Sequence, residues 1–156
     1  MRYAFTRNVN RSFSSLNARA ICHSTEDIEK VRQSMLNALG EIELHVSVAK
    51  GHHGNPMEII EARTEKMREI DGVFKKMQAE DLEAIDRTIE SRIDDACNLF
   101  LRLSKQDAFH EIIRLATDDD AIAIRIKIRA YPAKRENAIA QAREYLATAQ
   151  DKLSSA

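Results

Sequence analysis

Three cations alternate with isoleucines in one short stretch of the chain. Residues 121–129 read AIAIRIKIR, so Arg125, Lys127 and Arg129 stand two residues apart. In a β-strand such residues share one face, and the strand rises about 3.3 Å per residue. The three side chains are therefore predicted to project together from one strand. A row of this kind can contact several phosphate oxygens, because Arg and Lys donate to more than one acceptor.

Other side chains are predicted to extend this basic surface. In the segment CNLFLRL (97–103) alternate residues are apolar, which places Phe100 and Arg102 on the outward face of a second strand. An outward Phe would allow an unpaired base to stack on its ring. Lys134 and Arg135 follow at the predicted start of the last helix, next to the positive end of its dipole.

The same surface has two further interpretations. It can be an ordinary solvated face, with its cations balanced by acids such as Glu43 or Glu58 on neighbouring strands. It can also belong to a protein-interaction or self-associating module that binds acidic protein surfaces. The net charge of −1 gives no global field that would attract nucleic acid, so RNA binding would depend on this local patch.

Two other clusters contain residues that could do chemistry. The turn KGHHGNP contains His52 beside a second histidine, but no Cys or acid stands at ligand spacing, so a tight turn is favoured over zinc. His52 could still touch a phosphate. Asp118–Asp120 could hold Mg²⁺ or do acid–base work, although Asp is common in turns for local hydrogen-bonding reasons. With no nucleophile elbow, phosphate loop or dinucleotide fingerprint, the sequence predicts no catalytic residues, metal or cofactor.

Composition bounds the architecture that must position these residues. The 156 residues, 44% of them hydrophobic, predict one globular domain over residues 16–153. Residues 1–15 contain arginines and no acid, and are predicted to form a flexible basic arm; a transit peptide or a start codon assigned too early also fits. Cys22 and Cys97 are expected to be buried reduced thiols of a cytoplasmic protein. No apolar run approaches the roughly 20 residues of a membrane helix, so no membrane contact is expected.

Periodicity predicts the element order β-α-β-β-α-α-β-β-β-α. The expected strands are 16–23, 41–50, 57–63, 97–103, 110–116 and 121–129. The expected helices are one over 24–39, two within 64–93, and one from Pro132 to 153. Ser24 and Thr25 are candidate N-caps of the first helix, and Gly40 ends it. The fold class is therefore α+β, with one largely antiparallel or mixed sheet and helices packed on one face.

Three segments of the chain resemble an archaeal family described as predicted RNA-binding proteins or predicted exosome subunits. They are GHHGNPMEIIEAR, RIDDACNLFLRLSKQDAF and DDAIAIRIKIRAYPAKRENAI, in this order, and the resemblance runs over residues 17–146. It implies a domain akin to a ribosomal-protein fold, with RNA as the ligand, exosome or ribosomal proteins as partners, and no enzymatic activity. By position, the implied motif residues are His52, Gly54, Asn55, Arg102, Lys105, Gln106, Arg125, Lys127, Arg129, Lys134 and Arg135.

The residues and the resemblance together predict a non-enzymatic RNA-binding protein, either a monomer or a homodimer. In this hypothesis the cations of the exposed sheet face contact backbone phosphates. Lys105 and Gln106 contribute from the connector that follows the strand, and Phe100 offers a ring for stacking.

Overall fold

The computed structural model describes residues 9–50 and 56–154. Its strands are β1 (Phe13–Cys22), β2 (His45–Lys50), β3 (Pro56–Thr64), β4 (Asn98–Ser104) and β5 (Ala121–Ile128). Its helices are α1 (Ile28–Leu39), α2 (Met67–Lys75), α3 (Ala79–Arg87), α4 (Ile89–Arg92), α5 (Lys105–Phe109) and α6 (Arg135–Ser154), with a short 3-10 helix, η2 (Val9–Arg11). None of these helices is both long and apolar enough to span a membrane.

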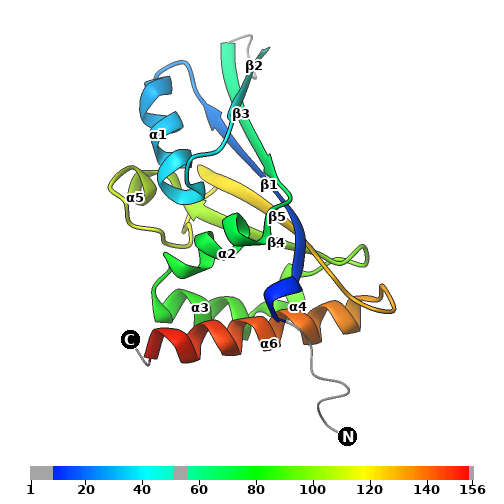
Figure 1. Ribbon diagram of the computed structural model, residues 1–156. Coiled ribbons are helices and arrows are strands. Elements are labelled where there is room, and N and C mark those ends of the chain that lie inside the picture. The colour runs from blue at the N-terminus through cyan, green and yellow to red at the C-terminus, as the bar shows by residue number, and fades with distance from the viewer. Residues whose placement is uncertain (1–8, 51–55, 155–156) are drawn as a thin grey trace, which may run out of the picture.

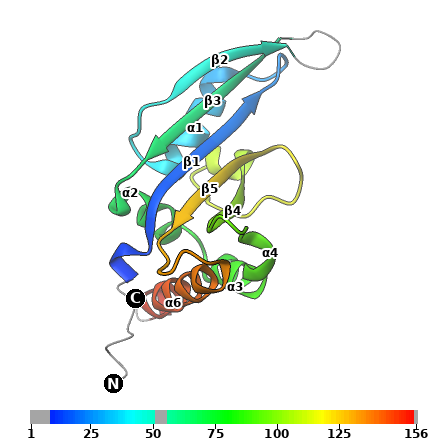
Figure 2. The ribbon, with the colours of Figure 1, turned by 90° about the vertical axis from the view of Figure 1, so that its right-hand side faces the viewer.

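The five strands form one open antiparallel sheet in the order β2-β3-β1-β5-β4. Helices α1, α2 and α5 lie against one face of the sheet, and α3, α4 and α6 lie beyond one end of it (Figure 1). In Figure 2 the other face of the sheet points toward the viewer, and no helix of the described chain covers it. The predicted α+β class is confirmed.

Strand β5 shows why the sheet has two different faces. Its four isoleucines, at 122, 124, 126 and 128, are buried, while Arg125 and Lys127 between them are exposed. Burying one such side chain contributes about 1.5–3 kcal/mol. A shift of one residue would expose every isoleucine and bury the cations, so the register of β5 is strongly specified.

Helix α1 begins and ends at residues with clear chemical reasons. Its N-cap is Asp27, whose side chain accepts from the Glu29 N–H at 3.0 Å, so the prediction of Ser24 or Thr25 as the cap is wrong. The predicted end at Gly40 is confirmed: this residue has a φ of 87° and donates its N–H to the Leu36 carbonyl at 2.8 Å. Glycine adopts that conformation without a Cβ penalty.

The predicted strand over 110–116 is wrong. In this segment only Ile113 and Leu115 make isolated bridges, to Met77 and Leu103 respectively. The backbone N–H of Leu115 donates instead to the Asp81 carboxylate at 3.3 Å. Because its backbone groups are divided among three separate partners, the segment forms no continuous ladder.

The boundary of the predicted N-terminal arm also needs correction. Strand β1 begins at Phe13, which is 1% exposed and packs against Phe74 and Tyr145 with ring centroids 5.5 and 4.7 Å apart. Ser12 is buried and accepts a hydrogen bond from the Gln141 amide at 2.9 Å. Residues 9–15 therefore belong to the folded domain, and residues 1–8 of the arm lie outside the described chain.

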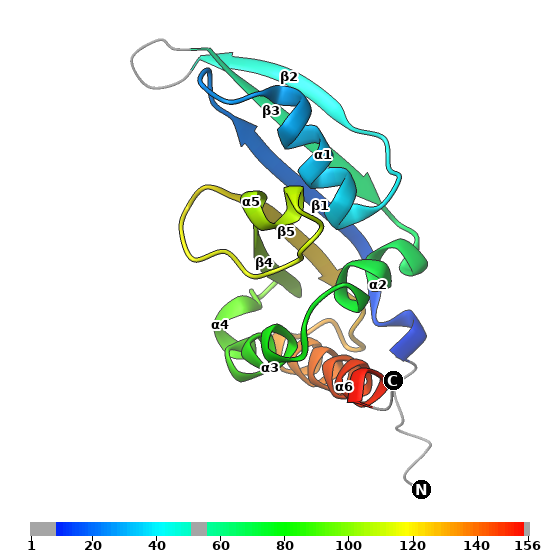
Figure 3. The same cartoon turned by 90° about the vertical axis from the view of Figure 1, so that its left-hand side faces the viewer.

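The edge strand β2 is shorter than the alternation of 41–50 predicts, because it begins at His45. Strands β2 and β3 extend together beyond the N-terminal end of α1 (Figure 3). Val48 of β2 is exposed, although the alternation of apolar residues in 41–50 predicts that it faces the core. The two cysteines, Cys22 and Cys97, are buried and free, as predicted.

Candidate nucleic-acid interface

We call the sheet surface that points away from the helices the open face. Its side chains are identified by the alternation in β5 and by the register of the paired strands, since directly opposite residues share a face. Its residues include Asn17, Arg19, His45, Glu61, Arg63, Phe100, Arg102, Ala123, Arg125 and Lys127, and the same register adds Ile21, Ser47, Ile59 and Asn98. Arginine is the commonest of these residue types.

Arg125 lies on β5, between the central strand β1 and the edge strand β4. It lies opposite Asn17 on β1 and opposite Phe100 on β4. On the far side of Asn17 lies Arg63, whose guanidinium donates to the Asn17 Oδ1 at 3.2 Å. Strands lie about 4.8 Å apart, so these four side chains form a row of roughly 14 Å across the sheet.

The row borders a shallow hollow of about 640 Å³ in the open face. Arg19, Arg63 and Arg125 line it together with the ring of Phe100. Ala123, which lies between Arg19 and Arg102 in the register, has only a methyl side chain. A small residue at this place leaves room for a ligand between two guanidinium groups.

The predicted exposure of the three alternating cations is confirmed. Arg125, Lys127 and Arg129 are exposed, and within the described chain none of them forms an ion pair with a carboxylate. The Lys127 ammonium donates to the Ala96 carbonyl, and Arg129 reaches a backbone carbonyl at 3.5 Å. The positive charge of Arg125 and Arg129 is therefore available to a ligand, while the exposed Lys127 also acts on the nearby Asp94 carboxylate.

Two other arginines of the open face do have carboxylate partners. Arg63 lies 3.2 Å from Glu65, and Arg102 lies 3.2 Å from Asp119. All four side chains are about half exposed or more, and ion pairs of this kind contribute only about 0–1 kcal/mol. Both arginines can therefore exchange their carboxylate for a phosphate at little cost.

The acids expected to neutralise the surface lie elsewhere. Glu58 is opposite the buried Cys22 and so belongs to the helix side of the sheet, while Glu43 precedes β2. The acid that does lie on the open face is Glu61, directly opposite Arg19 and His45. Glu61 therefore places its negative charge on the β2–β3 side of the open face, away from Lys127.

Lys105 must be removed from the predicted RNA contacts. Its side chain is 3% exposed, and its ammonium donates to the Ile21 carbonyl at 2.8 Å. The same ammonium pairs with Glu26 at 3.1 Å and with Asp120 at 2.6 Å. The exposed Gln106 follows it on α5, on the helix side of the sheet, so neither residue belongs to the open face (Figure 3).

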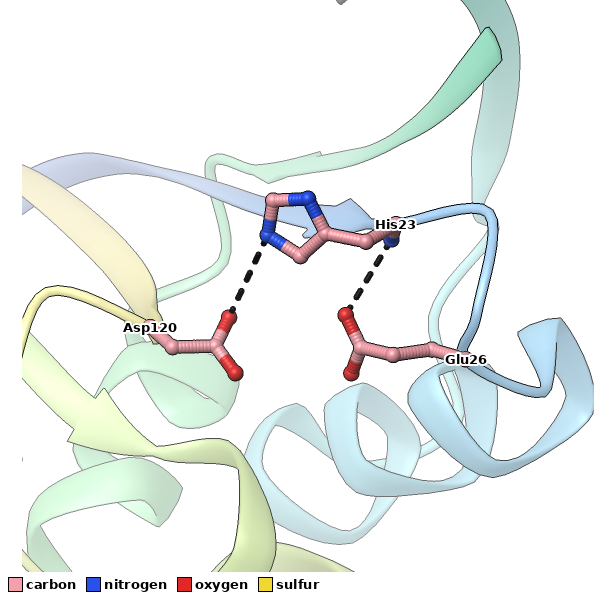
Figure 4. A group of neighbouring side chains, drawn as sticks. All are labelled: His23, Glu26 and Asp120. Carbon is pink, nitrogen blue, oxygen red and sulfur yellow. Dashed lines mark hydrogen bonds and ion pairs between the residues drawn. The ribbon is translucent and has the colours of Figure 1, made fainter. Parts of the chain in front are cut away.

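Figure 4 shows the one group of side chains in the described chain whose spacing suits a metal ion. Ligand atoms of His23, Glu26 and Asp120 lie within 4.8 Å of one another, and His23 Nε2 is 3.8 Å from Asp120. The Lys105 ammonium already contacts both carboxylates, so it supplies the positive charge that they need. A metal ion would have to displace this buried cation.

The remaining predicted residues have different surroundings. Arg135 donates to the carbonyls of Ile93, at 2.9 Å, and of Glu90, so it fastens the start of α6 to the end of α4. Lys134 is exposed just before that helix. His52 and Asn55 lie outside the described residues.

Arg19 and Arg63 are open-face cations that the sequence analysis did not single out. The signal for Arg19 was present, because it alternates with apolar Ala18 and Ala20 in β1. Its proximity to the β5 cations depends on the β1–β5 pairing, in which Arg19 lies opposite Ala123. Because β1 and β5 are far apart in the sequence, no local pattern indicates that they are neighbours.

The turn before β4 is held by hydrogen bonds to Asp94, and its Ala96 carbonyl accepts from Lys127. The Asp94 carboxylate accepts the N–H groups of Ala96 at 3.0 Å and of Asn98 at 2.8 Å. Burial alone would raise the pKa of Asp94, but these hydrogen bonds and the nearby Lys127 charge outweigh it and lower the pKa. Because the folded pKa is depressed, the ionised carboxylate stabilises the fold at neutral pH.

We expect Asp94→Ala to lower the free energy of unfolding by about 2 kcal/mol near neutral pH. The stabilisation is fully present above the unfolded pKa, about 3.9, and is lost as the pH falls through the lower folded value. The gap between variant and wild type should therefore shrink in acid, as urea unfolding at several pH values can measure. The exposed neighbour serves as the control, since Asp95→Ala should change little. A gap that stays constant down to strong acid would contradict this role.

The chain matches known proteins over most of its length. A family model described as RNA binding matches residues 15–128, which reach from β1 to the end of β5. RNA-binding protein PAB1135 of Pyrococcus abyssi is 27% identical over 142 residues, covering 85% of this chain and 92% of that protein.

Solved structures of similar chains share the fold. Protein AF2318 from Archaeglobus fulgidus is 38% identical with a TM-score of 0.76, over 85% of this chain and 99% of that one. Mth689, a DUF54 protein from Methanothermobacter thermautotrophicus, is 32% identical with a TM-score of 0.77, over 86% and 98% respectively. The chain therefore belongs to the RNA-binding family whose model matches residues 15–128.

Proposed function

We propose that this protein binds RNA through the open face and catalyses no reaction. One observation carries the proposal: Arg125, which lies on the open face between Asn17 and Phe100, is exposed and has no carboxylate partner in the described chain. Lys127 extends the positive surface along β5, and Arg19 extends it across β1. Family membership supports RNA as the ligand, as does the similarity to RNA-binding protein PAB1135.

The proposed mechanism is electrostatic. Guanidinium groups donate to two phosphate oxygens at once, and binding releases the counterions condensed on the RNA. Arg63 and Arg102 join the contact by exchanging exposed carboxylates for phosphates. Arg129 and Lys134 lie beyond the end of β5 and extend the same positive surface toward α6.

The salt dependence of binding tests this mechanism. We expect the triple variant Arg19→Gln, Arg125→Gln and Lys127→Gln to make the slope of log affinity against log salt shallower by about 2. Neutralising three phosphates of a single strand gives a slope of about −2. Fluorescence anisotropy of a labelled RNA in a series of KCl concentrations measures the slope, and circular dichroism checks the fold.

A second triple variant provides a matched control for this experiment. Lys30→Gln, Arg68→Gln and Arg87→Gln remove the same charge from α1, α2 and α3. We expect these changes to leave the slope almost unaltered. The open-face mechanism fails if the first variant is folded and keeps the wild-type slope, or if both variants lose it equally.

A Mg²⁺-dependent nuclease site at Asp118–Asp120 would need these carboxylates to hold the ion. Asp119 already pairs with Arg102 at 3.2 Å, and Asp120 pairs with Lys105 at 2.6 Å. These pairs support a role in local structure rather than in metal binding. RNA that stays intact when incubated with the protein and Mg²⁺ is the expected result.

We further propose, from the resemblance of the motifs alone, that the protein is a cytoplasmic accessory of the archaeal exosome, of the ribosome or of RNA processing. Co-purification from its own cells, followed by identification of bound RNA and protein, tests this. The rival interpretation, an open face that binds acidic protein surfaces, predicts that a protein partner is recovered and RNA is not.

A further inference from the structure

Phe100 is the aromatic side chain that the open face exposes in the described chain. Its side chain is 43% exposed, although it lies in the middle of β4 between the buried Leu99 and Leu101. The other phenylalanines and tyrosines of the described chain are buried, on α5, or in the loop before α6. A ring left in water on a sheet loses the benefit of burial, so a ligand with an apolar surface would gain from covering it.

The backbone holds this ring firmly in place. Phe100 pairs with Arg125 in the β4–β5 ladder, and its carbonyl accepts from the Arg92 guanidinium at 3.4 Å. Arg92 is itself fixed by a bond to the Thr88 hydroxyl at 2.7 Å. A platform on a paired strand costs little ordering entropy when a ligand binds to it.

The surroundings of the ring match the alternating chemistry of a single strand of RNA. Phe100, Arg125 and Arg19 line the same hollow, in which Ala123 leaves space. A flat apolar ring therefore lies one strand away from a guanidinium that has no carboxylate partner. Single-stranded nucleic acid offers a base with an accessible π-face and phosphates on both sides of it.

We propose that the open face binds single-stranded RNA, with an unpaired base stacked on Phe100 and the adjoining phosphates on Arg125 and Arg19. This inference rests on the proposed function and specifies its substrate class. In an A-form duplex both faces of each base are covered by its neighbours, so a duplex leaves the Phe100 ring without a partner. Single strands should consequently bind more tightly than duplexes of equal length.

The first experiment compares one RNA in two states. Fluorescence anisotropy is measured with a short, unstructured labelled strand and with the same strand annealed to its complement, at one salt concentration. We expect the single strand to bind about 10-fold more tightly than the duplex, in keeping with the contribution of one stacked base.

The second experiment changes the ring. Phe100→Ala should weaken single-strand binding about 10-fold and leave duplex binding and the salt slope unchanged, because stacking releases no counterions. Phe100→Tyr should retain the affinity. Ile112→Ala is the matched control, since Ile112 is 45% exposed but lies in the segment after α5 rather than on the open face.

The outcomes separate the two proposals. If neither form of RNA binds, the proposed function fails. If both forms bind equally and Phe100→Ala binds like the wild type, RNA binding stands and the single-strand inference is overturned. A folded Phe100→Ala protein that loses affinity for both forms alike also overturns it, because the ring then acts without a stacked base.

Discussion

Replacing Phe13 with alanine is expected to lower the free energy of unfolding by about 4 kcal/mol. The ring is 1% exposed and forms a three-ring cluster, in which Phe74 and Tyr145 also lie 5.1 Å apart. Truncation would remove the transfer free energy of the ring and leave a cavity among β1, α2 and α6. Because the sequence has no Trp, urea unfolding is best followed by circular dichroism.

Two companion variants make the result specific. Phe13→Leu keeps most of the volume and should cost less than about 1.5 kcal/mol. Ser14→Ala changes the next residue, which is only partly buried, and should cost little. If Phe13→Ala unfolds at the same urea concentration as the wild type, the start of β1 is not part of the core. The corrected boundary of the domain would then be wrong.

Replacing Lys105 with methionine is expected to cost about 3 kcal/mol, at the lower end for a broken buried ion pair, because Glu26 and Asp120 remain partly exposed. Methionine keeps the aliphatic stem but removes the ammonium. The Ile21 carbonyl then loses its donor, and two carboxylates face each other without a cation. The contacts of Lys105 link β1, α5 and the start of β5. Their loss should therefore lower the urea concentration at the midpoint of the whole unfolding transition.

A second set of changes separates the effect of the lost charge of Lys105 on stability from the effect of altered packing. Adding Glu26→Gln and Asp120→Asn to Lys105→Met should recover part of the lost stability, since the unpaired carboxylates are then gone. RNA affinity of Lys105→Met should equal that of the wild type at a temperature where both are folded, because Lys105 is not on the open face. A folded variant with weakened RNA binding would restore Lys105 to the interface.

Local patterns in the sequence determined several elements without further help. The alternation of isoleucines with cations in 121–129 predicted both the strand and its exposed cations, and Gly40 marked the end of the first helix. These features depend on the preferences of neighbouring residues, since the two faces of a strand alternate along it. They can therefore be read from a short window of sequence.

Other features were decided only by the tertiary structure. The sequence shows no reason for Lys105 to be buried, because its partner Glu26 lies 79 residues away and meets it only when α5 packs beside α1. Phe13 follows a run of polar and basic residues, and only the rings of α2 and α6 make it a core residue.

The tertiary structure also decided which side chains make up the open face. Arg19 and Arg125 lie on adjacent strands because β5 pairs with β1 rather than with a strand next to it in sequence. That pairing follows from burying one shared apolar face, which involves all five strands at once. The sequence by itself therefore determined that β5 carries cations, and the order of strands determined which other side chains join them.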